Sequence, residues 1–134
     1  MTTNLGETAD PAVLIPGNPG VVHETAWRMT TYGDVLHEAG SGLQRINTAD
    51  GWSGKAADAF RDTFNGQPVK WLEAGDCFHE AGSAVKDYAL TFEWARKQAV
   101  EAISLWDSAE AAKHQAELKY ARRLNKLISM RQQQ

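Results

Sequence analysis

Apolar and alanine residues recur at three- and four-residue spacing through most of the second half of the chain. A stripe sustained over about five heptads is typical of long helices that pack against other helices. We therefore predict a helix from about Pro68 that needs a second helical surface. No strand-like alternation accompanies it, which indicates an all-α fold. The stripe comprises Trp71, Ala74, Phe78, Ala81, Val85, Tyr88, Phe92, Ala95, Ala99, Ala102, Trp106 and Ala109.

A second amphipathic pattern lies earlier in the chain. Asn18-Pro19 predicts its start, with Asn as the cap and Pro in the first turn, and the pattern ends near Ile46. Gly33 and Gly40 flank its apolar stripe, which predicts close approach of a neighbouring helix. Together the two patterns predict a long antiparallel helical hairpin. The apolar stripe comprises Val22, Met29, Tyr32, Leu36, Ala39, Leu43 and Ile46.

The segment between the two patterns predicts the turn. Asn47 to Gly51 is rich in turn-forming residues. We expect Ser53 to cap the following helix, Gly54 to let another backbone approach Trp52, and Trp52 to plug the open end of the hairpin. Asn65 to Pro68 predicts a kink, with Gly66 as a left-handed stop.

These patterns divide the chain into three parts. Residues 1–18 are expected to be irregular, either lying along the surface or disordered. Residues 19–112 form the hairpin domain, and 113–134 form a basic helical tail or linker. The first helix spans ~42 Å but the stripe after Pro68 spans ~65 Å. Part of that stripe is therefore predicted to need a second copy, a partner or a following domain.

Charge and composition limit the function classes. The net charge is −3, so nucleic-acid binding is not expected. Residues 113–134 contain six cations and one acid, leaving 8 basic and 16 acidic residues in 1–112. Such a basic amphipathic tail can bind acidic surfaces, although we interpret it as a solvated helix end. No apolar run approaches the ~20 residues of a membrane span, and no cleavable leader is recognised.

A nine-residue pattern occurs twice, at Gly33–Ser41 and Gly75–Ser83, and each copy holds an Asp-x-x-His pair. Two such pairs could serve a metal-binding helical bundle. However, a hairpin turning near residue 50 places position 36 opposite about 63, so the two pairs should not converge. We expect both pairs to lie on a solvated outer face. The lone Cys77 has no activating base nearby. We therefore expect no catalytic residues, no metal and no cofactor.

Trp52-Ser53-Gly54, followed by Ala57 and Phe60, resembles the W-x-G turn of the WXG (Esx-like) superfamily of hairpins exported by type VII secretion. The chain looks closest to the N-terminal domain of actinobacterial type VII-secreted polymorphic toxins. That resemblance also covers Leu14 to Gly17, Trp71-Leu72 and Phe78-His79. It implies export without a cleaved signal peptide.

The resemblance also implies an aromatic-x-x-x-acid export signal. Only Trp106-x-x-x-Glu110 has this spacing, with Trp in place of the usual Tyr. A heterodimer partner could instead supply the signal. Packing against a small helical partner, or in a self-dimer, would involve Phe78, Val85, Tyr88 and Phe92.

The sequence thus favours a non-enzymatic secretion-targeting domain that heads a toxin or stands alone. It is recognised by the export machinery and does not insert stably into membranes. Two alternatives remain: a structural coiled-coil scaffold or adaptor, and a metal-dependent helical-bundle enzyme that uses the Asp-x-x-His pairs.

Overall fold

The computed structural model describes residues 2–46, 48 and 51–134. All the regular secondary structure within these residues is helical. The helices are α1 (Pro11–Leu14), α2 (Pro19–Gln44), α3 (Lys55–Phe64) and α4 (Gln67–Gln132). The predicted all-α class is therefore confirmed. None of the described helices is long and apolar enough to cross a membrane. Two compact units share the chain, one of residues 18–92 and one of residues 1–17 with 93–134.

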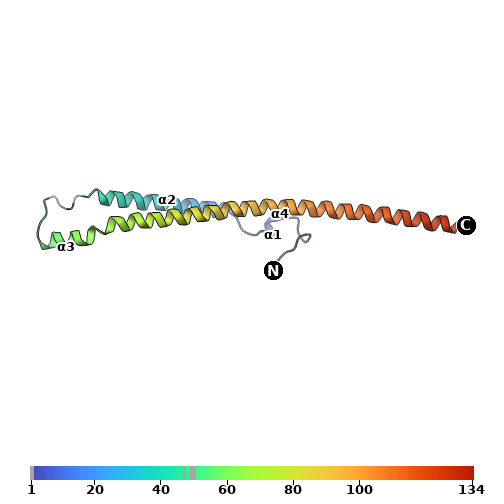
Figure 1. Ribbon diagram of the computed structural model, residues 1–134, viewed down its shortest axis with the longest axis horizontal. Helices are drawn as coiled ribbons and strands as arrows, with labels where there is room; N and C mark the ends of the chain where they lie inside the picture. The colour runs from blue at the N-terminus through green and yellow to red at the C-terminus, as the bar shows by residue number, and fades with distance from the viewer. Residues whose placement is uncertain (1, 47, 49–50) are drawn as a thin grey trace. The chain divides into compact units, whose positions relative to one another are not determined.

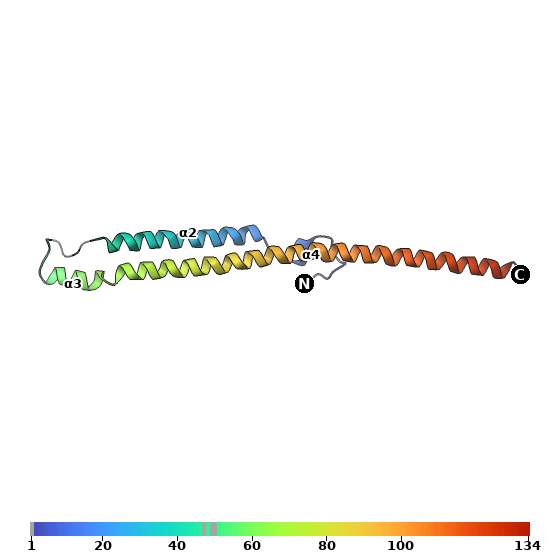
Figure 2. The ribbon, with the colours of Figure 1, turned by 45° about the horizontal axis from the view of Figure 1, so that its top comes forward.

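The first unit is the predicted antiparallel hairpin. In Figures 1 and 2, α2 lies along the first half of α4 in both views. As predicted, α2 begins with Pro19 in its first turn, and the Asn18 side chain accepts a hydrogen bond from the Gly20 N–H at 2.9 Å. The helix ends at Gln44, two residues before the predicted Ile46.

Glycines bring the two helices of this unit into backbone contact. A Cβ atom built on Gly33 would lie 2.9 Å from the carbonyl oxygen of Gly75, and one built on Gly75 would lie 2.9 Å from that of Gly33. A Cβ built on Gly40 would lie 3.1 Å from the Pro68 carbonyl oxygen, and one built on Gly82 would lie 3.1 Å from the Ala26 carbonyl oxygen. The predicted close approach at Gly33 and Gly40 is thus confirmed, and α4 contributes a matching pair of glycines.

The face of α4 that meets α2 differs from the predicted stripe. Gly75, Gly82 and Ala89 are buried, whereas most of the large residues of the stripe are exposed, with Phe92 buried and Val85 half-buried. The exposed members include Trp71, Phe78 and Tyr88. The helices therefore pack through their small residues, because only small side chains allow two backbones to approach so closely.

The predicted register is also wrong. His37 contacts Leu72 and Asp76, so position 37 lies opposite the mid-seventies, not the low sixties. The described residues between Gln44 and Lys55 are non-helical. A non-helical segment advances ~3.3 Å per residue, against 1.5 Å per residue in a helix. A short non-helical connection can therefore run the full length of α3, which shifts the register of α2 against α4. Asn47 and Asp50 of the predicted loop lie outside the described residues.

The predicted kink before Pro68 is present. α3 ends at Phe64, the Asn65 N–H donates to the Arg61 carbonyl at 2.9 Å, and α4 begins at Gln67. Gly66 is not among the glycines with positive φ, so the left-handed stop predicted there does not form.

In the second unit, the N-terminal segment is not wholly irregular. It contains α1, whose first turn is capped by the Asp10 carboxylate accepting from the Ala12 N–H at 2.8 Å. The Arg96 side chain of α4 donates to the carbonyls of Ile15 and Gly17, at 2.5 Å each. The segment therefore lies along α4, which is one of the two outcomes expected for it.

The glycine contact yields a stability prediction. Gly33→Val should lower the free energy of unfolding by about 1–3 kcal/mol, because its Cβ would clash with the Gly75 backbone. Gly42→Val is the matched control: a Cβ there meets only the Arg45 side chain, at 3.9 Å, and the change should stay within about 0.5 kcal/mol. Urea unfolding followed by circular dichroism measures both. Equal losses in the two variants would show that the helices do not pack at Gly33.

Candidate functional site

The turn presents an exposed run of aromatic rings. The Trp52 ring lies 5.4 Å from that of Phe60, and Phe60 lies 5.3 Å from Phe64, measured between ring centroids. Trp52 is 46% exposed. It therefore packs on one face of α3 and does not fill the open end of the hairpin as a buried plug.

Ser53 does not cap the helix, contrary to expectation. α3 begins at Lys55 with Gly54 at the cap position, and no side chain bonds to its first turn. Among the described residues, nothing lies within 4 Å of a Cβ built on Gly54, so none of them makes the close backbone approach that was predicted. Gly54 has φ +110°, a conformation that L residues rarely adopt. The glycine is required here by backbone geometry.

Arg61 organises the turn, and sequence reasoning missed it. Its Nε donates to the Thr48 carbonyl at 2.8 Å, and its Nη2 donates to the Trp52 carbonyl. Asp58, one turn earlier, accepts from Nη1 at 3.2 Å. One half-buried guanidinium thus ties the loop that carries Trp52 to α3. A lone Arg beside an acid on a short helix carries no sequence signal for this role.

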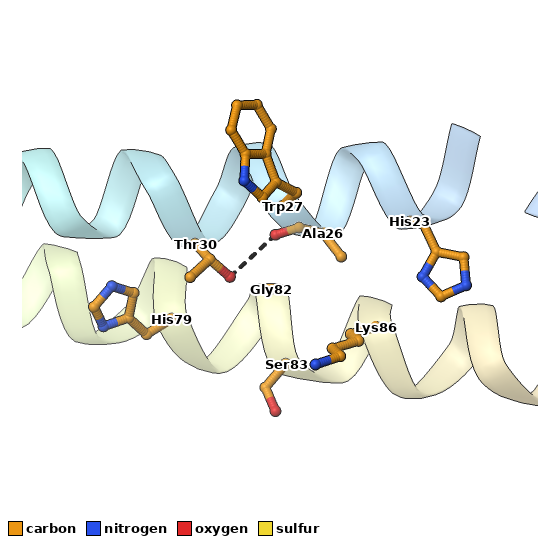
Figure 3. Close-up of a pocket in the computed structure, with 8 residues that line it drawn as sticks. All are labelled: His23, Ala26, Trp27, Thr30, His79, Gly82, Ser83 and Lys86. Atoms are coloured by element: carbon orange, nitrogen blue, oxygen red, sulfur yellow. Dashed lines mark hydrogen bonds between the residues drawn. The ribbon is translucent and has the colours of Figure 1, made fainter. Parts of the chain in front are cut away.

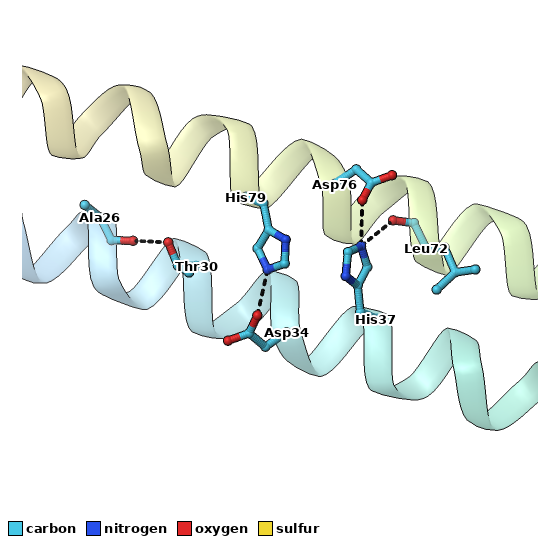
Figure 4. A network of polar contacts seen from close by, with 7 residues as sticks. All are labelled: Ala26, Thr30, Asp34, His37, Leu72, Asp76 and His79. Atoms are coloured by element: carbon cyan, nitrogen blue, oxygen red, sulfur yellow. Dashed lines mark hydrogen bonds and ion pairs between the residues drawn. The ribbon is translucent and has the colours of Figure 1, made fainter.

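The two Asp-x-x-His pairs converge, contrary to expectation. Figure 4 shows His37 reaching Asp76 and His79 reaching Asp34, each Nε2–Oδ1 distance being 2.8 Å. The two imidazole rings meet edge to face, with centroids 4.7 Å apart. Each copy of the repeat therefore supplies the His of one pair and the Asp of the other. The error follows directly from the wrong register.

This cluster does not have the form of a metal centre. The two Nε2 atoms point to opposite helices in Figure 4, and each contacts its own carboxylate. Among the described residues, no group of three or more His, Cys, Asp or Glu side chains could hold an ion. The pairs instead crosslink α2 and α4 beside the Gly33–Gly75 contact. The sequence repeat, identical at seven of its nine positions, was the signal that could have revealed this pairing.

A shallow groove of about 490 Å³ lies beside this cluster (Figure 3). Trp27 stands on one side of it, and His79 and Lys86 line it from α4. Thr30 bonds back to the Ala26 carbonyl at 3.1 Å, so its hydroxyl belongs to the helix. The groove is an open surface feature between the two helices, and His23 and Ser83 also line it.

The predicted interaction residues differ in accessibility. Phe92 is buried and Val85 is half-buried, whereas Phe78 and Tyr88 are exposed. Phe78 also contacts Tyr32 of α2 edge to face, at 4.8 Å between centroids. Trp106 and Glu110 lie on α4 in the other unit, and both are exposed.

The helices and their aromatic turn define an all-α helical hairpin domain. The chain belongs to the family described as "Putative T7SS secretion signal domain", whose model matches residues 2–134. This membership supports a targeting role in type VII secretion and export by that route. Searches of curated proteins and of solved structures gave no match.

The role of Arg61 can be tested directly. Arg61→Ala removes charged hydrogen bonds to two carbonyls and should cost about 1.5–3 kcal/mol, with faster amide exchange in residues 51–54. Arg28→Ala, which breaks only the exposed pair with Glu24, should cost less than about 0.5 kcal/mol. Urea unfolding and hydrogen exchange measure these effects. Unchanged exchange around Trp52 would refute the anchoring role.

Proposed function

We propose that this chain is a non-enzymatic, WXG-like targeting domain that pairs through α4 with a small helical protein during type VII secretion. The observation that carries this proposal is the exposed aromatic stripe of Trp71, Phe78 and Tyr88. The glycine contacts already bring α2 and α4 together, and Trp71 and Tyr88 stay largely outside them, while Phe78 also contacts Tyr32 of α2. Contiguous exposed apolar surface of this kind is typical of protein-interaction sites.

The family resemblance extends this proposal to context. We infer that the domain either heads a secreted polymorphic toxin of actinobacteria or is itself a small secreted protein. Trp52, Ser53 and Gly54 would then form the turn recognised during export, and Trp106 with Glu110 the export signal. A self-dimer that uses the same stripe, as in a structural scaffold, is the competing arrangement.

The partner surface gives the first test. Tyr88, which is 61% exposed, can be replaced with little effect on folding. Tyr88→Ser should weaken pairing with a small helical protein encoded beside this chain at least about 10-fold, because exposed aromatics dominate interface energies. Tyr120→Ser, at a site 70% exposed in the tail, is the matched control and should not weaken it.

Calorimetric titration measures the affinity, and light scattering measures the mass of each species. A one-to-one complex sensitive to Tyr88 supports the targeting proposal. A stable self-dimer indifferent to that neighbour would contradict it and favour the scaffold.

The turn gives a second test. Trp52→Ala should reduce export while the helix content stays unchanged, because the ring packs on Phe60 and is 46% exposed. Gly54→Ala should do the same and cost about 1–3 kcal/mol through strain at φ +110°. Export is measured as the fraction of protein outside intact cells. Normal export of both variants would show that the turn is only structural, as the scaffold alternative requires.

A further inference from the structure

The N-terminal strap, defined as residues 2–17, lies against the helix that carries Trp106. A Cβ built on Gly6 would lie 2.6 Å from both Cε2 and Cζ2 of the Trp106 indole. Gly6 has φ +91°, which brings its backbone flat against the ring. Thr8 and Asp107 line a cavity of about 180 Å³ beside this contact. No side chain other than hydrogen fits between the strap and the ring.

Polar contacts hold one end of the strap on α4 and shape the other end. At the first, Arg96 donates to the carbonyls of Ile15 and Gly17. At the second, a turn within the strap is closed by the Glu7 carboxylate, which accepts from the Asn4 N–H at 2.7 Å and from its amide group at 3.3 Å. These hydrogen bonds lower the pKa of Glu7. The strap is therefore a positioned segment, with a local turn over Trp106.

The strap covers a face of α4 that would otherwise be bare. Ala99 is only 7% exposed, and Ala102 and Ile103 are half-buried, although the other described helix of this unit is only the four-residue α1. From Ser104 to the C-terminus every residue of α4 is exposed. The strap thus occupies the place that the sequence predicted for a partner, and it stops at Trp106.

Apolar contacts hold the strap only weakly. Leu5 and Val13, two of its large apolar residues, are exposed, and α1 has no buried residue. A segment that buries little apolar surface opens at low free-energy cost. Such a segment can be displaced by a helix that buries the same face of α4 more completely.

We propose that the strap is a displaceable cover of the α4 face formed by Ala99, Ile103 and Trp106, and that it restrains export until a partner helix replaces it. The proposal rests on the proposed function, since it regulates the Trp106–Glu110 signal. The partner is an amphipathic helix whose apolar face fits the small residues at 99 and 102. Closed, the strap hides one edge of the indole; open, it leaves the ring and Glu110 accessible together on one helix face.

Two variants open the strap without altering the signal. Gly6→Val forces side-chain atoms into the indole, and Arg96→Gln removes the charged donor to Ile15 and Gly17. Lys97→Gln changes the neighbouring exposed cation and is the matched control. Amide exchange in residues 4–15 of the purified chain should become about 10-fold faster in both opening variants and stay unchanged in the control.

Export by intact cells is then compared for the same three variants and for Trp106→Ala. We expect about 3-fold or greater export of both opening variants, export of the control at the wild-type level, and loss of export for Trp106→Ala. An opened strap with wild-type export would overturn the cover role while leaving the targeting function intact. Unchanged exchange in Gly6→Val would overturn it as well.

Failure of the proposed function gives a different pattern. If the wild-type chain and the opened variants all remain inside cells, the targeting function fails, and the regulatory role fails with it. If Trp106→Ala is exported normally while the opening variants gain export, the cover role stands and the signal lies elsewhere on the uncovered face.

Discussion

The hairpin depends on the backbone contact between Gly33 and Gly75. The carbonyl oxygen of each glycine leaves no room for a Cβ on the facing glycine. Main-chain atoms therefore set the distance between α2 and α4. Side chains that flank so close a contact are pushed to its edges. Large side chains are therefore seldom buried in this unit, Leu36 and Phe92 being two that are, and Trp71 and Tyr88 stay exposed.

Glycines alone would not fix the register of the two helices. They recur seven residues apart on each helix, so a slip of one heptad would bring glycines together again. The reciprocal His37–Asp76 and His79–Asp34 contacts break this degeneracy, because a slipped hairpin loses both. Each pair is only partly shielded from solvent and contributes modest stability. Their main effect is therefore to select one register, and with it the position of the Trp52 turn.

The sequence was sufficient for features that depend on local chemistry. Asn18-Pro19 and Pro68 mark helix starts because their backbone preferences act within one turn, and the long apolar period requires helices. The sequence was insufficient to predict which residues of α4 contact α2. Apolar periodicity gives weight to large residues, whereas the contact between these helices uses small ones. The sequence was also insufficient for the register, which depends on how far a non-helical connection reaches. The Arg61 contacts and the strap join residues distant in sequence and leave no local pattern.

The structure shows an unusual division of residues along α4. Its glycines and small residues face the rest of the chain, whereas its aromatic residues face outward for much of its length. A helix that only stabilised its own fold would bury the aromatic residues first, because they offer the largest apolar area. The exposure of Trp71 and Tyr88 beside the glycine contacts is therefore a feature that the stability of this helix does not account for. The strap shows the same preference, since it closes over Trp106 with a glycine and leaves Leu5 and Val13 exposed.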